Sequence, residues 1–191
     1  MLIELYGLPG SGKTTLARKM AEEQGYEIIK IRKKWELILY NLFFLFKRPI
    51  KFIRLFLSVC RNSGSSKLFY YKLMNCFLDY NAKYEKALHF EKAIMDQGHH
   101  LNAFALFDLP ISKTEMKKFL SLIPKPDRLL VFDISFEESL RRTKERGNFS
   151  RPQFGEEYVK KWQKAIDVNN RLFLELLPEL GAGQEIEIEV I

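Results

Sequence analysis

The sequence has few of the residues on which disulfide-bonded, zinc-binding and membrane-spanning proteins depend. Its two cysteines, Cys60 and Cys76, are far apart and form no CxxC pair, which argues against a zinc site. The longest apolar stretch, residues 37–46, is short beside the roughly 20 residues that a membrane-spanning helix needs. A charged residue at Glu4 leaves little room for a secretory signal peptide. We therefore expect a cytoplasmic protein whose thiols are reduced.

The length and charge of the chain limit its organisation more than its choice of partner. With 191 residues, the chain suits one domain around a single sizeable core. It carries 31 Lys and Arg against 24 Asp and Glu, a formal net charge of +7. This balance favours a partner that bears phosphate groups, but charge alone does not separate nucleotides from nucleic acid or anionic lipid.

Apolar residues recur with strand-like spacing in short segments and with helical spacing in longer ones. Strands are predicted at residues 2–6, 27–31, 92–96 and 127–133, with a final edge strand at residues 185–190. Helices are predicted at residues 12–24, 136–146 and 156–177, and several more in an insertion at about residues 32–90. This alternation predicts a three-layer α/β domain with a mostly parallel sheet and a helical insertion.

The first predicted strand runs directly into a phosphate-binding motif. Residues 7–14, GLPGSGKT, match GxxxxGK[ST] at every fixed position, between a strand and a helix, which predicts a P-loop NTPase domain. Glycines let the backbone approach a phosphate, and the amides that open the helix face the anion. Lys13 would neutralise the β- and γ-phosphates of ATP, and the Thr14 hydroxyl would bind Mg²⁺. The predicted nucleotide-binding residues are Gly7, Pro9, Gly10, Ser11, Gly12, Lys13, Thr14 and Thr15.

Three classes of P-loop protein compete for this motif. A GTPase would need an NKxD sequence, and the chain contains none. A remodelling ATPase would carry a second acidic residue after the strand-end Asp96, where this chain has Gln97. A kinase needs a second phosphate clamp that excludes water before transfer. A kinase is therefore the favoured class, and an ATP-binding protein that couples nucleotide occupancy to a partner is the alternative.

A basic helix near residue 140 fits the second clamp. Arg142 and Arg146 are four positions apart and share a helical face, Gly147 ends the helix, and Arg151 follows. Converging guanidinium groups suit the spread charge of a phosphoryl group during transfer. The alternative is an ordinary solvated basic helix. We predict an Arg-rich lid at about residues 137–155, in which Arg142 also contacts the nucleotide.

These motifs resemble those of the nucleoside monophosphate kinase-like group of P-loop kinases, and of thymidylate kinases most of all. The resemblance rests on the phosphate loop, on the strand that ends at Asp96 and on the lid run from Ser139 to Arg151. In that family an Arg and an aromatic residue follow the strand-end Asp, where this chain has Gln97 and Gly98. The resemblance implies ATP as the phosphoryl donor, and it implies the acceptor less strongly.

The residues after the third main strand are candidates for metal binding or proton transfer. Asp96 stands at the carboxyl end of a strand, where ligands bind in such sheets. It would ligate Mg²⁺ together with Thr14, or accept a proton from an acceptor hydroxyl. A simple turn residue is the alternative. His99 and His100 are weaker candidates for contact with the acceptor.

The insertion combines aromatic residues with a basic stripe. Lys47, Lys51 and Arg54 fall on one helical face beside a Phe-rich run. The favoured interpretation is a helical cover over the acceptor site, with Phe43, Phe44, Phe52 and Phe56 as its apolar lining. Peripheral contact with an anionic membrane and a homodimer face are the alternatives. Pro49 interrupts the helix that an interfacial segment would need.

We therefore predict an enzyme that transfers the γ-phosphoryl group of Mg-ATP to a small-molecule acceptor. Lys13, Asp96, Arg142 and Arg146 are the predicted catalytic residues. Arg32, Asp96 and Arg151 are the predicted acceptor-binding residues, and Thr14 and Asp96 the predicted metal ligands. A nucleoside monophosphate, a sugar and a lipid-linked alcohol remain open as acceptors. No nucleic-acid partner is expected.

Overall fold

The computed structural model describes residues 1–147, 151–181 and 186–191. Five parallel strands form one sheet in the order β2-β3-β1-β4-β5. The strands are β1 (Leu2–Gly7), β2 (Glu27–Ile28), β3 (Ala93–Met95), β4 (Arg128–Phe132) and β5 (Glu187–Val190). The predicted α/β class and parallel sheet are confirmed. The predicted edge strand at residues 185–190 begins outside the described residues, and its described part is β5.

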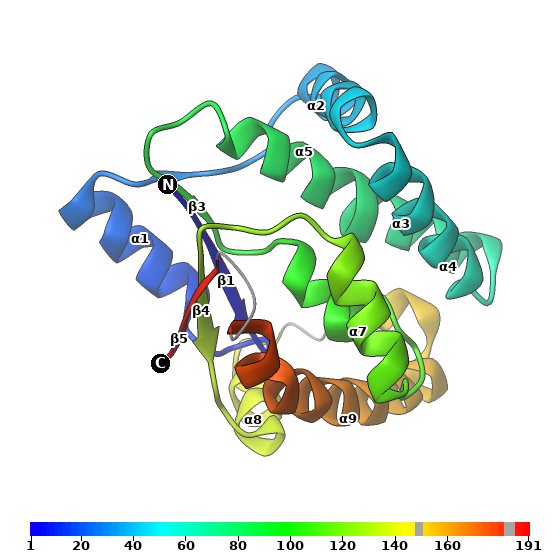
Figure 1. Cartoon of the computed structure of the whole chain (residues 1–191). Coiled ribbons are helices and arrows are strands. Elements are labelled where there is room, and N and C mark those ends of the chain that lie inside the picture. Colours follow the sequence, from blue (N-terminus) through cyan, green and yellow to red (C-terminus); the bar gives the residue numbers. More distant parts are fainter. Residues whose placement is uncertain (148–150, 182–185) are drawn as a thin grey trace.

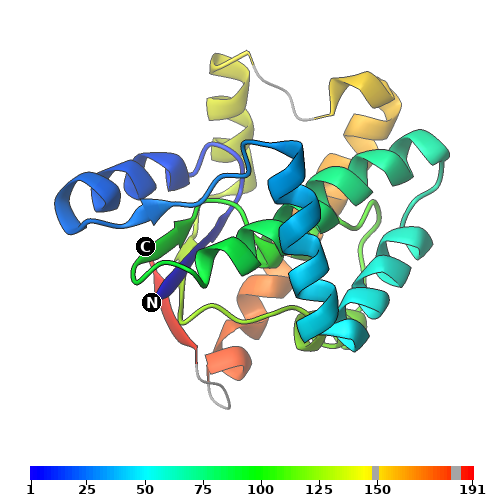
Figure 2. The same ribbon diagram turned by 90° about the horizontal axis from the view of Figure 1, so that it is seen from above.

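Helices surround this sheet on both faces (Figures 1 and 2). Helix α1 covers one face, and α5 and α9 with their neighbours cover the other. The helices are α1 (Lys13–Gln24), α2 (Lys34–Lys47), α3 (Pro49–Arg61), α4 (Ser66–Lys72), α5 (Asp79–Ala87), α6 (Asn102–Ala105), α7 (Lys113–Leu122), α8 (Phe136–Glu145) and α9 (Glu156–Gly181). The described residues also form the π-helix η1 (Leu73–Leu78) and the 3₁₀ helices η2 (His99–Leu101) and η3 (Pro152–Phe154).

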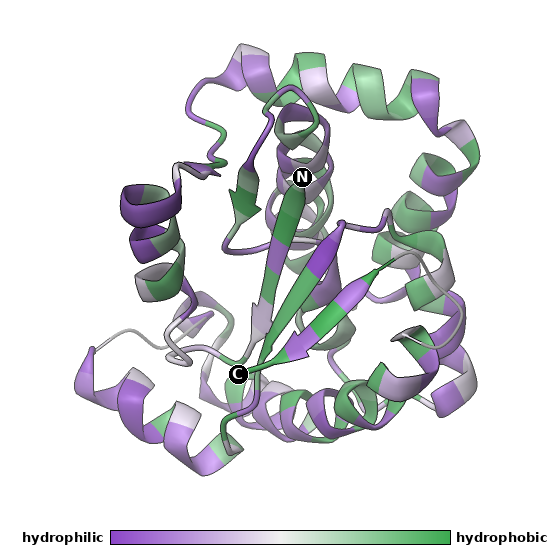
Figure 3. Ribbon diagram, turned by 60° about the vertical axis from the view of Figure 1, so that its left-hand side comes forward, coloured by the Kyte–Doolittle hydropathy of each residue, from purple (hydrophilic) through white to green (hydrophobic). Residues whose placement is uncertain are grey.

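Alternation along β1 divides the core into two parts. Ile3 and Leu5 face α1, where they pack with Ala17 and Met20. Leu2 and Tyr6 face the opposite side and join the larger core. Successive side chains of a strand point to opposite faces, so a strand buried on both sides is apolar throughout. The central strands are accordingly mostly apolar in Figure 3.

The strand after α1 is shorter than predicted. The pattern predicts a strand at residues 27–31, but β2 has only two residues. The Ile29 amide still donates to the carbonyl of Ile94 (3.0 Å), and the chain then leaves the sheet to enter α2. The apolar residues that extended the prediction serve as packing: Ile29 is fully buried in the larger core.

Helices fill most of the predicted insertion, between β2 and β3. Pro49 stands in the first turn of α3, where its missing amide hydrogen costs nothing, and it separates α2 from α3. No helix in the described parts of the chain is long and apolar enough to cross a membrane. The extent of the domain and of the lid stays a prediction, and residues 148–150 of the lid lie outside the described residues.

Candidate active site

The phosphate loop lies between the carboxyl end of β1 and the start of α1, as its sequence predicts. Gly7 has a φ of 150°, and a Cβ at this position would come within 2.8 Å of the Phe132 Cβ on β4. Gly10 has a φ of 78° and passes so close to α8 that a Cβ would lie 3.1 Å from the Cβ of Arg142. Only glycine fits both positions, because the loop is wedged between two neighbouring elements.

Lys13 occupies the centre of the loop. Its ammonium group donates to the Gly7 carbonyl (2.6 Å), the Leu8 carbonyl (2.8 Å) and the Ser11 hydroxyl (3.1 Å). Burial lowers the pKa of Lys13 to about 8, and the nearby Asp96 carboxylate partly offsets the effect. The site therefore holds a desolvated cation, which an arriving phosphate would stabilise strongly.

Thr14 and Asp96 place two side-chain oxygens where they could hold a metal ion. The Thr14 hydroxyl donates to Asp96 Oδ2 over 3.3 Å, so the tips of α1 and β3 meet at one point. Mg²⁺ prefers oxygen ligands and usually takes one or two protein groups, with phosphates and water completing its shell. Among the described residues, no cluster of three or more His, Cys, Asp or Glu side chains could hold a metal. The pair therefore fits a Mg²⁺ ion that arrives with a nucleotide.

A cavity of about 250 Å³ opens over the loop. It is lined by Pro9, Gly10, Ser11, Gly12, Lys13, Thr14, Thr15, Gln97, Thr143 and Arg146. The loop and the first turn of α1 border this space, at the positive end of the helix dipole. The cavity therefore gathers most of the predicted nucleotide-binding residues at one place.

Helix α8 is hydrogen-bonded to the phosphate loop through Arg142, which the sequence predicted, and through Ser139, which it did not. The Ser139 hydroxyl donates to the Pro9 carbonyl (2.7 Å), a contact that no motif indicates. Arg142 donates to the Gly10 carbonyl (3.2 Å) and pairs with Glu138 (2.6 Å). Arg146 caps the helix over the cavity, and Gly147, with a φ of 67°, follows it. The two predicted lid arginines thus both lie beside the phosphate loop.

A second cavity of about 270 Å³ shares Gly7, Pro9 and Lys13 with the loop. Its other walls come from α4, η1, α5, η2, α6 and α9, and from Gln97 and Arg151 between elements. The lining is Tyr71, Asn75, Cys76, Asp79, Tyr80, Gln97, Leu101, Phe104, Ala105, Arg151 and Trp162. Four aromatic side chains with a few amide and acidic groups are typical of a site for a flat polar ligand. Only Arg151 in this wall was predicted from the sequence.

Arg151 is held from all sides in this wall. It is only 4% exposed and takes a left-handed backbone conformation with a φ of 68°. Its guanidinium group lies 4.0 Å from the centre of the Trp162 ring. It donates to the Tyr158 hydroxyl (2.7 Å), the Ala105 carbonyl and Asp108. Its Nε has no partner among the described residues. A buried donor without a partner in a cavity wall is a candidate ligand contact.

Asp108 connects Arg151 to a second buried cation. Its Oδ1 accepts from the Tyr158 hydroxyl (2.7 Å), and its Oδ2 accepts from Lys72 (2.6 Å), whose side chain is fully buried. Burial lowers the pKa of Lys72, and Asp108 opposes this shift. The arrangement fixes Arg151 in one orientation at the cavity.

Comparison with known proteins supports the resemblance inferred from the motifs. The family model "ATPase family associated with various cellular activities (AAA)" matches residues 3–37, which hold β1, the phosphate loop and α1. A probable thymidylate kinase from Pyrococcus abyssi is 28% identical over 159 residues, covering 78% of this chain and 72% of the relative. The AAA match ends before β3, so it describes the phosphate loop that many P-loop proteins share.

Solved structures of deoxyadenosine kinase from M. mycoides match nearly the whole chain. The form with bound dATP is 17% identical with a TM-score of 0.55, and covers 100% of this chain and 90% of its own. The form with the products dCMP and dCDP is 16% identical with a TM-score of 0.52, and covers 98% and 89%. The chain has the fold of a P-loop kinase. The predicted P-loop NTPase fold and its resemblance to nucleoside monophosphate kinase-like proteins are thereby confirmed.

The residues after Asp96 depart from the thymidylate kinase pattern for a reason in the core. A Cβ at Gly98 would lie 2.5 Å from the Glu4 carboxyl carbon, so the family's aromatic residue does not fit here. Glu4 is buried and accepts from the His100 amide (2.6 Å), while its Oε2 meets His100 Nδ1 (2.9 Å). An acidic residue inside β1 thus dictates the small residue after β3.

The weak prediction that His99 or His100 touches the acceptor is wrong. His99 is 1% exposed and His100 is 3% exposed, and neither lines the two cavities beside the loop. Rings of Phe44, Tyr80 and Tyr84 surround His99 at 6.0–6.3 Å. This burial lowers the pKa of His99 to about 3, assisted by His100 and nearby cations. Both histidines are buried in the core. Their closeness to Asp96 in the sequence does not indicate this.

The predicted apolar lining from α2 and α3 is also wrong. Phe44 is fully buried in the core, and Phe52 and Phe56 pack against it. None of these residues, nor the half-buried Phe43, lines the cavity beside the loop. The aromatic wall comes instead from α4, α5, α6 and α9, because the inner faces of α2 and α3 are used to cover α5 and η1.

The basic stripe is largely occupied within the molecule. Lys47 and Arg48 both pair with the buried Glu85 on α5, and Lys51 donates to the Ile123 carbonyl (3.3 Å). The outer faces of α2 and α3 still expose a row of large apolar side chains: Trp35, Ile38, Leu42, Phe46, Ile50, Ile53 and Leu57. Membrane contact and a homodimer face both stay predictions for this row.

Arg32 is exposed, and its side chain lines neither cavity beside the loop. Its backbone amide donates to Glu36 (2.9 Å) at the start of α2. The role predicted for Arg32 in acceptor binding therefore has no geometric support here and stays a prediction.

Proposed function

We propose that this protein is an ATP-dependent phosphotransferase that moves the γ-phosphoryl group to a nucleoside or nucleoside monophosphate. One observation carries the proposal: the acceptor-sized cavity and the nucleotide cavity share Lys13 and Pro9. A phosphoryl group held by Lys13 would face both a donor and an acceptor. The similarity to a probable thymidylate kinase supports a kinase, as does the fold shared with deoxyadenosine kinase.

The assigned roles follow from position. Lys13 would neutralise charge on the phosphates, and Thr14 and Asp96 would hold Mg²⁺, which would supply further positive charge to offset that of the phosphates. Arg142 and Arg146 would close over the transferring group with the lid at about residues 137–155. Asp96 is half-buried beside Thr14, and there it would also accept a proton from an acceptor hydroxyl.

The cavity walls suit a base and a phosphate. Tyr71, Tyr80, Phe104 and Trp162 offer faces and edges for a flat ring, and aromatic stacking on a base contributes about 1–3 kcal/mol. The Arg151 Nε would donate to an acceptor phosphate, since it is buried and lacks a partner among the described residues. The free thiols of Cys60 and Cys76 fit a reducing compartment such as the cytoplasm.

The test is acceptor-stimulated turnover. ADP release from Mg-ATP should rise with at least one deoxynucleoside or deoxynucleoside monophosphate, and chromatography should show the acceptor gaining one phosphate. Lys13→Ala should abolish the stimulation, because it removes the charge aimed at the phosphates, whereas Lys19→Ala, an exposed lysine on α1, should not. ADP release that no nucleoside or nucleotide stimulates would favour an ATPase coupled to a partner.

A further inference from the structure

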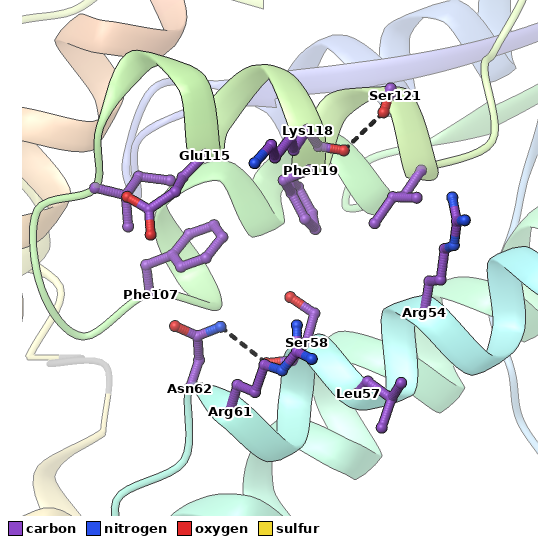
Figure 4. Close-up of a pocket in the computed structure, with 12 residues that line it drawn as sticks. Arg54, Leu57, Ser58, Arg61, Asn62, Phe107, Glu115, Lys118, Phe119 and Ser121 are labelled. Atoms are coloured by element: carbon purple, nitrogen blue, oxygen red, sulfur yellow. Dashed lines mark hydrogen bonds between the residues drawn. The ribbon is translucent and has the colours of Figure 1, made fainter.

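A groove separate from both nucleotide-site cavities lies between α3 and α7 (Figure 4). Its volume is about 710 Å³, within the range of about 300–1,000 Å³ typical of small-ligand sites. Helix α3 contributes Arg54, Leu57 and Arg61 from one side, and α7 contributes Lys118 and Phe119 from the other. None of its lining residues borders the phosphate loop or the acceptor cavity.

The groove has an apolar floor. Phe107 and Phe119 meet edge to face with ring centres 5.5 Å apart, and they are 6% and 3% exposed. Leu57, by contrast, is 41% exposed at the edge of the groove. The floor is therefore rigid core, while the edge leaves apolar surface for which the described chain supplies no cover. Apolar surface in a concavity is what an apolar ligand buries on binding.

The rim of the groove carries positive charge that the described chain does not neutralise. Arg54, Arg61 and Lys118 are exposed, and their side chains make no ion pair or hydrogen bond with the described residues. Among the groove's lining residues the sole acid is Glu115, which caps α7 by accepting from the Ser112 amide (2.9 Å) and hydroxyl (2.8 Å). These hydrogen bonds and, to a lesser extent, the charge of Lys118 lower the pKa of Glu115, which therefore stays ionised but forms no salt bridge with the described rim residues.

Two arginines of α8, unlike those of the groove rim, are neutralised within the chain. On α8, Glu138 pairs with both Arg141 and Arg142, and its pKa falls to about 2 because these two arginines donate to it. The groove combines an apolar floor with three unpaired cations, which is a complementary surface for a molecule that is apolar at one end and anionic at the other.

We propose that the α3–α7 groove is a second ligand site for a small amphipathic anion, an aromatic or alkyl body that carries a carboxylate, sulfonate or phosphate. The apolar body lies on Leu57, above the floor formed by Phe107 and Phe119, and the anion lies between Arg61 and Lys118. A compact ligand is favoured over a bilayer, because a flat surface does not fill a concavity between two helices.

Binding is measured with 8-anilinonaphthalene-1-sulfonate, an aromatic sulfonate whose fluorescence rises in apolar surroundings. Saturating Mg-ATP keeps the phosphate loop occupied during the titration. The double variant Arg54→Glu/Arg61→Glu should weaken binding by about tenfold or more, because it removes the charge-assisted contact of Arg61 and reverses the charge of Arg54 on the same rim. Ser58→Phe, which fills the groove without changing its charge, should also weaken binding of the probe. Weaker binding in both variants would show that the probe needs the space of the groove as well as its charge.

Matched controls distinguish binding in the groove from non-specific electrostatic attraction of the anionic probe to the basic protein. Arg18→Glu/Lys19→Glu changes the charge by the same amount on exposed residues of α1 and should leave binding within about twofold. The neutral analogue N-phenyl-1-naphthylamine should bind more weakly than the sulfonate. Inorganic phosphate alone should not displace the sulfonate. Unchanged binding in both groove variants, or equal binding of the neutral analogue, overturns the proposal. The proposal is also overturned if the protein is a dimer that binds no probe and that dissociates in Arg54→Glu/Arg61→Glu. The groove would then be an interface with a second copy of the chain.

Discussion

Replacing Asp108 by Asn tests the charge network behind the acceptor cavity. The carboxylate is the counter-charge for Lys72, whose side chain is fully buried, and for Arg151, whose side chain is 2% exposed. Without it, two buried cations retain only neutral acceptors, namely carbonyl groups and the Tyr158 hydroxyl. Breaking a buried pair by removing one partner costs about 3–5 kcal/mol. We expect a loss of this size in the free energy of unfolding.

Urea denaturation followed by tryptophan fluorescence measures this loss, since Trp162 stacks on Arg151. The double variant Lys72→Met/Asp108→Asn should be more stable than Asp108→Asn by at least about 1 kcal/mol, because one uncompensated cation is removed. In kinetics, the KM for the acceptor should rise while ATP affinity stays unchanged, because Arg151 loses its orientation.

The control is Asp167→Asn, which breaks an ion pair with Arg171 on the exposed face of α9. Exposed pairs contribute about 0–1 kcal/mol, so this variant should be nearly neutral. A loss in Asp108→Asn no larger than in this control would refute the view that Asp108 balances two buried charges.

Three further predictions concern the loop, the lid and the core. The pKa of Lys13 is near 8, so above pH 8 the binding of ATP should be coupled to protonation of this side chain, and ATP affinity should fall by up to about tenfold for each unit that the pH rises. Calorimetry in buffers of different ionisation enthalpy detects this proton uptake. Its absence would contradict the role of Lys13 in binding the phosphates. Arg142→Ala and Arg146→Ala should each lower kcat more than ATP affinity, because the contacts form mainly during transfer; single-turnover kinetics separates the two effects, and equal losses would indicate simple nucleotide binding. The pKa of His99 near 3 lies below the usual 6.5, so between these pH values the unfolded chain binds more protons than the folded chain. The free energy of unfolding should therefore fall by up to about 1.4 kcal/mol per pH unit as the pH drops. His99→Leu should flatten this dependence between pH 6.5 and 5, and an unchanged slope would assign the dependence to other groups.

Local patterns predicted those parts of the site that are contiguous in the sequence. The loop from Gly7 to Thr14 is one segment whose conformation depends on its own glycines, and Gly147 ends α8 as its sequence indicates. The strand at Asp96 was also found, because three buried apolar residues precede it. Each of these signals is complete within a few residues.

The acceptor cavity could not be found in this way. Tyr71, Phe104 and Trp162 lie far apart in the sequence and line one cavity only because the fold brings α4, α6 and α9 together. The buried partner of His100 is Glu4, 96 positions away, so its proximity to Asp96 in the sequence was misleading. Amphipathic patterning in α2 and α3 predicted a buried face correctly, but it did not indicate which element that face covers.

The position of Lys72 links two parts of the molecule thermodynamically. Its ammonium donates both to the carbonyl of Asn62, which lines the α3–α7 groove, and to Asp108, which orients Arg151 at the acceptor cavity. A ligand in the groove that displaces Asn62 would change the partners of Lys72 and thereby the acceptor affinity. Linkage requires the reverse effect to be equal, so saturation with acceptor would change the affinity of the groove by the same factor. A fluorescent ligand in the groove would then report acceptor binding without any turnover.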